Sequence, residues 1–356
     1  MKKSKRPTLA DIARHARVST ITVSRAIHKT GPVSQDLRER IESSIAALGY
    51  TSRKTVQPPA GGTIAVLTGD LLNPFFPEIV RGIQEEADNY GLILTLYNLT
   101  DHPNRQQQLL QRMSRQRVDG VILMGSAPFP ELLTWREQHH ISLVVLNRRI
   151  VQPGIHCILV DFENAIYRAA QHLLGFKHTR IGYLAPSRNT EVAQARWRGF
   201  ESALTEAGLS RRPEWCPSIP PGLDIDGGLQ AMRSLLELPS AERPTGVIAF
   251  NDAVALGALH AVRIHGLCVP QDVSIMGVDD IFVAAHAYPP LTTISQPKYQ
   301  MGKLAVQTLA RMNEGQMNTT GGCTVLESPL IVRESTGPAP LPSSSHEGPT
   351  RLSEAS

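Results

Sequence analysis

The alternation of apolar and polar positions divides the chain into a short helical part and a long part in which strands and helices alternate. In the helical part, residues 8–28 show the 3.6-residue spacing of an amphipathic helix twice, with a break at Val18-Ser19. Thr8 can cap the first helix, and Asp11 places an acidic side chain in its first turn. Four apolar side chains then share the inner face: Leu9, Ile12, Ala13 and Ala16.

The second helix begins at Ser19 and runs for about two turns. Val23, Ala26 and Ile27 turn inward. The outer face is small, rich in hydroxyl groups and carries one arginine: Thr20, Ile21, Ser24 and Arg25. Such a helix fits the major groove of DNA, where side chains reach base edges. A helical hairpin without a nucleic-acid role is the alternative reading.

A third helix is expected over residues 35–48, capped by Ser34 and ended by Gly49. Leu37, Ile41, Ile45 and Leu48 form its inner face. Three helices predict a compact all-α module over residues 1–50, which is small for a stable domain.

Residues 51–62 read as a linker, because Pro58-Pro59 and Gly61-Gly62 oppose a helix. Arg53 and Lys54 either reach DNA phosphates or are plain linker residues, and both readings stay open.

From Thr63 onward, buried-strand runs alternate with amphipathic helices, and the rhythm restarts after residues 157–160. This alternation predicts an α/β core of two Rossmann-like lobes with parallel sheets. The expected strands are TIAVLTG, LILTLY, VDGVILMG, ISLVVLN, RIGYLAP, GVIAFN and VSIMGVD, followed by a last pair, VLES and LIVRES. The expected helices span residues 75–90, 105–116, 130–139, 163–174, 193–207, 226–236, 253–265 and 299–313.

Charge is distributed unevenly along the chain. Residues 1–55 contain twelve Lys or Arg and four Asp or Glu, a net charge of +8; since all 356 residues carry +4, the rest carries −4. A basic head on a mildly acidic body indicates that the head binds a polyanion. The basic residues have no apolar face beside them, which argues against a membrane surface.

Other classes of protein find little support in the sequence. A capped helix follows the basic start in place of a signal peptide, and no apolar run could span a bilayer. There is no G-x-G-x-x-G after the first strand, no P-loop and no nucleophile with a histidine partner, so we expect no enzyme, cofactor or metal. The four cysteines lack metal-type spacing and read as thiols of a cytoplasmic protein: Cys157, Cys216, Cys268 and Cys323.

Several strings in the head occur in order: T-L-x-D-I-A from Thr8, V-S at 18–19, T-V-S-R from Thr22, V-S-Q-D-L-R-E-R-I from Val33 and L-G-Y from Leu48. They resemble the helix-turn-helix of the lactose-repressor/galactose-repressor (LacI/GalR) family of transcription regulators. The resemblance implies a homodimer that reads a near-palindromic operator, with Arg25 on a guanine. The DNA-binding residues would be Thr8, Ser19, Thr20, Ile21, Thr22, Ser24, Arg25, His28, Lys29, Arg53 and Lys54.

The linker departs from the family pattern. The family's hinge folds into a short helix on the operator and inserts a leucine into the minor groove. Residues 51–62 contain no leucine, are about three residues short and offer only Val56 as a small wedge.

The resemblance extends to about Ser335 and implies a periplasmic-binding-protein-like core. Residues 63–161 with 291–320 would form its N-terminal lobe, and residues 162–290 with 321–336 its C-terminal lobe. Residues 337–356 are rich in Pro, Ser and Gly and predict a disordered tail without a tetramerisation helix.

Ligands of such sheets bind beyond the carboxyl ends of the strands. The strings NPFF, VDG, RWRGF, FNDAVALG, GVDD and LTTI are similar to the family's effector pocket. This match implies that the rings of Phe75 and Phe76 stack on a flat or sugar-like face of the ligand. Arg196 would form a bidentate contact with the ligand, and Asn251 and Asp279 would form hydrogen bonds with its hydroxyl groups. The effector-binding residues would be Phe75, Phe76, Ser126, Asn147, Asp161, Arg188, Arg196, Asn251, Asp279 and Gln296.

Two features of this pocket stay open. Asp161 and Asp252 each directly precede a helix, so both are candidates for helix caps, Asp252 more than Asp161. Arg148, Arg188 and Arg196 could converge on an anion, which would favour a sugar acid or a phosphorylated sugar. The sequence thus predicts a DNA-binding repressor controlled by a sugar or sugar acid. The alternative is a regulator with a non-standard hinge, controlled by a protein partner or a purine-like ligand.

Overall fold

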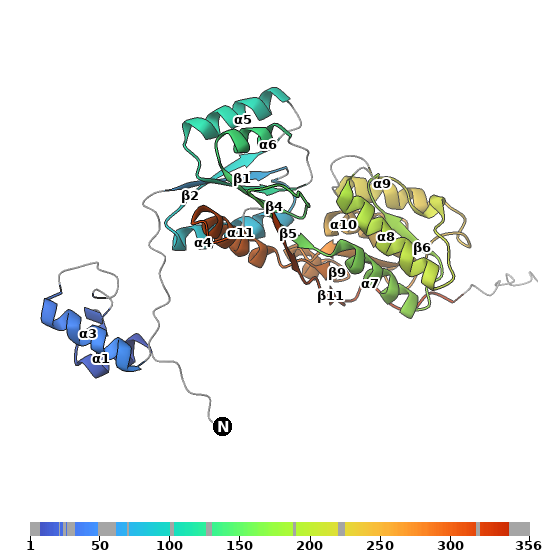
Figure 1. The fold of residues 1–356 in the computed structure, drawn as a ribbon. Coiled ribbons are helices and arrows are strands. Elements are labelled where there is room, and N and C mark those ends of the chain that lie inside the picture. Colours follow the sequence, from blue (N-terminus) through green and yellow to red (C-terminus); the bar gives the residue numbers. More distant parts are fainter. Residues whose placement is uncertain are drawn as a thin grey trace, which may run out of the picture. The chain divides into compact units, whose positions relative to one another are not determined.

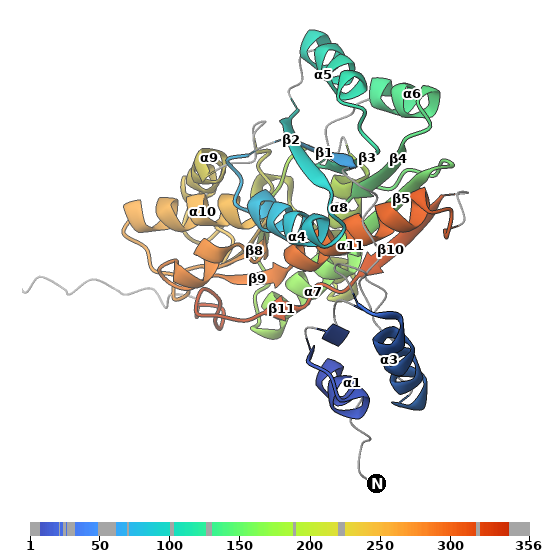
Figure 2. The same ribbon diagram turned by 90° about the vertical axis from the view of Figure 1, so that its left-hand side faces the viewer.

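The computed structural model divides the chain into two units, Met1–Pro59 and Ala60–Ser356 (Figures 1 and 2). The structure describes residues 8–20, 22–23, 26, 33–48, 62–69, 71–99, 103–125, 130–187, 190–219, 225–317 and 321–341. In these ranges no helix combines the length and the apolar character that crossing a membrane requires.

The first helix of the small unit is α1 (Leu9–Ala16), and it has the predicted cap. The Thr8 hydroxyl accepts from the Asp11 amide, and the Thr8 amide donates to the Asp11 carboxylate at 2.9 Å. Arg17 has a left-handed backbone with φ 52°, and the Val18 amide donates to the Ala13 carbonyl at 3.0 Å. The turn at Val18-Ser19 is therefore a helix end closed by its own backbone.

The second helix starts at Ser19, whose hydroxyl accepts from the Thr22 amide at 3.1 Å. A third helix, α3 (Gln35–Leu48), packs against α1. Ile12, Val23 and Ile41 are fully or almost fully buried at the centre of these three helices. The expected small helical module is thus confirmed in its core. Seven residues of the predicted DNA-binding set lie outside the described residues, as do residues 51–61 of the linker: Ile21, Ser24, Arg25, His28, Lys29, Arg53 and Lys54.

Two contacts that the sequence did not reveal join α3 to α1. The Arg40 guanidinium donates to the Ala16 carbonyl at 2.8 Å, at the carboxyl end of α1. His15 Nδ1 lies 3.0 Å from the hydroxyl of Ser44, which is itself buried. A cation at a helix carboxyl end is favourable because the last carbonyls lack partners within the helix.

The larger unit begins with a six-stranded parallel sheet in the order β10-β5-β4-β3-β1-β2. Figure 1 shows α5 and α6 on one face of this sheet and α4 with α11 on the other. Its strands are β1 (Thr63–Thr68), β2 (Ile93–Asn98), β3 (Gly120–Met124), β4 (Ser142–Leu146), β5 (Ile155–Val160) and β10 (Gly322–Leu326). Its helices are α4 (Phe75–Asn89), α5 (Pro103–Arg115), α6 (Pro130–Gln138) and α11 (Lys298–Asn313).

A second sheet has the order β11-β9-β8-β7-β6, and β11 is its antiparallel edge. Its strands are β6 (Ile181–Leu184), β7 (Gly246–Ala249), β8 (Ser274–Asp279), β9 (Thr292–Ser295) and β11 (Leu330–Ile331). The helices of this lobe are α7 (Phe162–Gly175), α8 (Glu191–Glu206), α9 (Ile225–Leu236) and α10 (Asp252–Ile264), with 3-10 turns at Pro213–Trp215 and Phe282–His286. The two predicted parallel-sheet lobes are confirmed.

Glycines let the helices of this lobe pack closely in pairs. A Cβ atom on Gly199 of α8 would lie 2.0 Å from the Glu163 carbonyl oxygen of α7. One on Gly257 of α10 would lie 1.9 Å from the Ile225 carbonyl oxygen of α9. Both distances are shorter than any real contact, so each pair depends on the absence of a side chain.

The lobe boundaries near the end of the core differ from the prediction. The sequence assigned residues 291–320 to the N-terminal lobe, but β9 pairs with β8 in the second sheet. It assigned residues 321–336 to the C-terminal lobe, but β10 pairs with β5 in the first sheet. The two last strands are therefore not a pair, although β11 does lie in the second lobe. A strand of four or five residues does not encode which of two similar sheets it joins, because pairing is decided by distant neighbours.

The chain consequently crosses between the lobes three times. The first crossing follows β5, the second follows β9, and the third follows β10. We refer to these three segments as the crossovers: residues 161, 296–297 and 327–329.

The predicted disordered tail also begins later than expected. The Gly337 amide donates to the Ser274 hydroxyl at 3.0 Å, and the Ala339 amide donates to the Phe176 carbonyl at 2.9 Å. Gly337 and Ala339 therefore bind the second lobe, and residues 342–356 of the predicted tail lie outside the described residues. Pro- and Gly-rich composition cannot reveal such docking, because it depends on polar groups elsewhere in the lobe.

Acid should weaken this docking through His178. The ring is fully buried, with Nε2 3.0 Å from the Gly337 carbonyl and Nδ1 2.9 Å from Thr245 Oγ1. Burial lowers the pKa of His178, so below the ordinary histidine pKa the unfolded chain binds the extra proton first. Stability is then lost as the pH falls from about 6.5 toward the lowered pKa.

We expect His178→Asn, which cannot take up this proton, to flatten that acid slope. Between pH 7.5 and 5, melting temperatures of wild type and variant should converge by a few degrees. Buried carboxyl groups titrate in both proteins, so they cancel in the comparison. Parallel pH profiles for the two proteins would contradict the prediction.

Candidate functional site

A cavity of about 600 Å³ lies between the two lobes, beyond the carboxyl ends of their strands. It has the size of an ordinary small-molecule site. Seven of the ten predicted effector-binding residues line it, and they come from both lobes: Phe75, Phe76, Asn147, Arg196, Asn251, Asp279 and Gln296. Ser126 and Arg188 lie outside the described residues.

The first lobe contributes an aromatic wall to the cavity. Phe75 and Phe76 open α4, and their rings meet edge to face with centroids 5.3 Å apart. The Asn73 side chain, which also lines the cavity, accepts from the Phe75 amide at 2.9 Å and fixes the start of the helix. An aromatic wall beside polar groups suits a ligand with both apolar and hydroxyl-bearing faces.

Arg196 of α8 is the cation among the described residues of the cavity, and it is held between two aromatic rings. Its guanidinium carbon lies 4.0 Å from the ring centroid of Phe162 and 4.1 Å from that of Phe250. One terminal nitrogen donates to the Phe250 carbonyl, while buried Nε has no hydrogen-bond partner within the described chain. Burial lowers the pKa of Arg196, and the nearby Tyr183 and Asp279 oppose that shift. The guanidinium stays charged and is positioned to donate to a ligand.

The sequence did not single out Phe162 and Phe250, although both line the cavity. Phe250 directly follows β7, and Phe162 follows Asp161, the helix cap after β5. At such positions an aromatic residue looks like an ordinary core residue. A rule that scored every residue just after a strand end would have found them.

Asp279 lines the cavity at the end of β8. Its carboxylate accepts from Gln296 Nε2 at 2.6 Å, and Gln296 Oε1 accepts from Asn147 Nδ2 at 2.8 Å. Burial raises the pKa of Asp279 to about 6, against the opposing effect of Arg196. This chain of hydrogen bonds runs from the first lobe through a crossover to the second, so a ligand touching it contacts both lobes.

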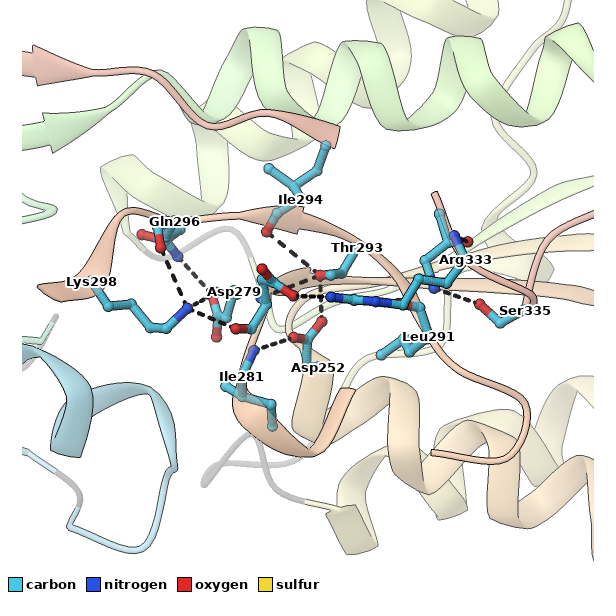
Figure 3. A network of polar contacts seen from close by, with 12 residues as sticks. Asp252, Asp279, Ile281, Leu291, Thr293, Ile294, Gln296, Lys298, Arg333 and Ser335 are labelled. Carbon is cyan, nitrogen blue, oxygen red and sulfur yellow. Dashed lines mark hydrogen bonds and ion pairs between the residues drawn. The ribbon is translucent and has the colours of Figure 1, made fainter. Parts of the chain in front are cut away.

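Lys298, which the sequence analysis did not select, secures the same crossover (Figure 3). Its ammonium group is buried and donates to the Asp279 carbonyl at 2.5 Å and the Asp280 carbonyl at 2.8 Å. It also lies 3.6 Å from the Glu78 carboxylate of α4 in the first lobe. The interaction therefore fixes the turn after β8 and links it to α4.

The structure corrects the interpretation of Asp252. Asn251, not Asp252, caps α10, since its side-chain oxygen accepts from the Val254 amide at 2.8 Å. Asp252 is fully buried and accepts from the Thr293 hydroxyl at 2.6 Å and the Ile281 amide at 2.8 Å (Figure 3). Burial raises its pKa well above the ordinary value. Asp252 thus joins α10 to the second sheet.

Of the two roles left open for Asp161, the structure shows that of a helix cap. Its exposed side chain accepts from the Asn164 amide at 3.0 Å and caps α7, and it does not line the cavity. Arg148 does not line the cavity either. Among the described residues that do, Arg196 and Asp279 carry the charges, and Arg188, the third arginine of the suggested anion site, lies outside the described residues.

In the small unit, the described part of the predicted DNA-binding set shows two kinds of side chain. Thr20 is exposed, as expected of an outer-face residue. Thr8 is engaged in the cap of α1, and the hydroxyls of Ser19 and Thr22 lie 2.8 Å apart. These three side chains therefore stabilise the starts of the two helices, in addition to any contact with DNA.

Known proteins are similar to this chain along almost its whole length. Residues 8–52 match the family model described as bacterial regulatory proteins, lacI family, and residues 170–336 match that of a periplasmic binding protein-like domain. The chain is 35% identical over 334 residues to the ribose operon repressor of Haemophilus influenzae, covering 92% of this chain and 98% of the relative.

Solved structures show the same likeness. A complex of the transcriptional regulator CelR with cellobiose is 29% identical, with a TM-score of 0.70, and the match covers 93% of this chain and 100% of that one. A lac repressor dimer bound to operator and the anti-inducer ONPF is 26% identical, with a TM-score of 0.68, covering 94% and 100%. Both lobes and the small unit therefore have counterparts in regulators that bind DNA or sugar.

Proposed function

The chain belongs to the lacI family of bacterial transcription regulators, and we propose that it represses its target genes as a homodimer. A neutral sugar would control it, either by releasing the dimer from DNA or by promoting its binding to DNA. The family consists of DNA-binding repressors with small-molecule effectors. The observation that carries the proposal is the cavity between the lobes, where the charged residues among the described lining are one arginine and one aspartate. The dimer is supported by the lac repressor, which is dimeric on its operator.

We test the DNA-binding part by selecting genomic fragments with the purified protein and following affinity against salt. A homodimer with two heads should enrich a near-palindrome with half-sites about one helical turn apart. Affinity should fall steeply as salt rises, because the basic head displaces counterions from phosphates. Binding that depends only weakly on salt and shows no sequence preference would argue against the proposal.

Arg25 is expected to make the base contact in each half-site. Arg25→Ala should weaken operator binding by about 1–3 kcal/mol and relax the preference at one position of each half-site. Arg53→Ala is the matched control, since a phosphate contact has no sequence preference. It should weaken all DNA equally and reduce the salt slope by about one. Unchanged sequence preference in Arg25→Ala would refute the assignment.

The effector is proposed to be a neutral, hydroxyl-rich ligand. Arg196 and Asp279 compensate each other, so an extra ligand anion would leave Asp279 facing a second negative charge in a buried site. Phenyl walls suit the apolar faces of a sugar ring. The cellobiose complex of CelR shows that this fold can hold a neutral sugar.

Melting temperatures with a panel of ligands test this proposal. The panel holds ribose, cellobiose, a nucleoside, gluconate and a phosphorylated sugar. A neutral ligand at about 100 times its Kd should stabilise the core by about 2.7 kcal/mol, while the anionic ligands leave it unchanged. A response to the anionic ligands alone would reverse the proposal.

A further inference from the structure

Two cysteines face each other across neighbouring strands of the first lobe. In the parallel pair of β10 and β5, Cys323 is the register partner of Cys157. Register partners point to the same face of a sheet, and neighbouring strands lie about 4.8 Å apart. A disulfide needs Cα atoms between about 4.4 and 6.8 Å apart, so the backbone already has the required spacing.

The opposite face of the same strands keeps this register in place. His156 Nε2 lies 2.9 Å from Thr324 Oγ1, and these two residues flank the cysteines along their strands. A slip of one residue would break this contact and turn both cysteines to the other face. The cysteine pair is thus a fixed feature of the sheet.

The two thiols differ in access. Cys323 is exposed on β10, the edge strand of the sheet, whereas Cys157 is fully buried. Cys157 Sγ accepts from the Ile150 amide at 3.2 Å, and burial raises the pKa of its thiol to about 11. An oxidant therefore reaches Cys323 first, and Cys157 is the second partner.

We propose that Cys157 and Cys323 form a reversible disulfide when the protein meets a peroxide. The Cys323 thiol releases its proton to solvent, its thiolate attacks the peroxide, and the O–O bond breaks to give a sulfenic acid and hydroxide. The hydroxide takes up the released proton and becomes one water. Cys157 then displaces the sulfenic oxygen as a second water, giving the S–S bond and leaving its proton on that water. Two thiols lose two electrons in total, and hydrogen peroxide is reduced to two waters. A dithiol reductant reverses the change.

The position of the pair connects it to the movement of the lobes. β5 and β10 each lead directly into a crossover, at Asp161 and at residues 327–329. Phe162, the first residue of α7 after the first crossover, lines the cavity. A covalent bridge between these strands fixes two of the three crossovers to each other. The oxidised protein then binds its effector differently, a consequence that rests on the proposed function, whereas the bridge itself does not.

Peptide mapping of the full chain tests the bridge. After one equivalent of hydrogen peroxide, free thiols are alkylated, and the chain should keep two of its four thiols. The peptides containing Cys157 and Cys323 should be joined within one chain, and dithiothreitol should separate them. Cys323→Ser should keep all three remaining thiols, and Cys268→Ser, which alters the other exposed cysteine, should still form the bridge.

Three results would overturn the bridge: both cysteines alkylated, Cys323 joined to a second chain, or Cys323 oxidised further with Cys157 free. For the effector, Kd is compared before and after peroxide, using the ligand that responds in the melting panel. A change of about fivefold or more in wild type, absent from Cys323→Ser, supports the coupling. An unchanged Kd with the bridge formed would overturn the coupling and leave the bridge established. If no ligand of the panel raises the melting temperature, the proposed effector class is contradicted and the bridge is not affected.

Discussion

Replacing Gly199 with alanine is expected to destabilise the core by about 1–3 kcal/mol or more. The new Cβ atom would lie 2.0 Å from the Glu163 carbonyl oxygen and 3.0 Å from the Tyr167 amide nitrogen. Both neighbours are backbone atoms of α7, so no side chain can rotate away and the two helices must separate. The higher helix propensity of alanine offsets only about 0.5–1 kcal/mol of this loss.

Urea unfolding measures the change, and Gly175→Ala is the matched control. Gly175 ends α7, the partner helix, and a Cβ atom there would meet nothing within 4 Å. We expect the control to match wild type or exceed it slightly. Equal stability of the two variants would show that α7 and α8 can move apart freely, contrary to the packing described above.

The second large effect is the loss of effector binding in Arg196→Met. The side chain keeps most of its volume between Phe162 and Phe250, but it loses every donor directed at the cavity. Hydrogen bonds to a charged group contribute about 1.5–3 kcal/mol each, so one lost bond weakens binding by roughly 10- to 150-fold. Calorimetry with the responding ligand measures Kd.

Arg198 offers the control for this experiment. It lies on the same helix, pairs with Glu163 at 2.8 Å, and does not line the cavity between the lobes. Arg198→Met should bind the effector like wild type. Both variants should keep their affinity for operator without effector, because the head is a separate unit. Wild-type Kd in Arg196→Met would remove this residue from the site.

The elements that local chemistry defines could be predicted from the sequence. The structure places α4 at Phe75–Asn89 where residues 75–90 were expected, and it places α11 at Lys298–Asn313 where residues 299–313 were expected. Periodicity, a Pro or Asn before the helix and a Gly after it lie within a few residues of each boundary. The cap of α1 by Thr8 and Asp11 was predictable for the same reason.

Features that depend on distant partners could not be predicted in this way. Asp252 looked like a cap because it precedes a helix, but its donors come from Ile281 and Thr293. Residues 337–339 looked disordered because the partners of Gly337 and Ala339, Ser274 and Phe176, lie far away in the sequence. The cavity was found through strand ends, which position residues in any parallel sheet, but the family resemblance supplied most of its members.

The three crossovers restrict how the lobes can move. A body attached at three neighbouring places can rotate about the line that joins them, but it cannot slide or turn about other axes without straining an attachment. Opening and closing of the cleft is therefore the motion that strains the three attachments least, and we expect different ligands to shift the lobes along it. Substitutions of the lining side chains would then change which ligand binds and with what affinity. The movement of the lobes that follows binding would stay the same. This separation makes the core a suitable starting point for regulators with new ligands.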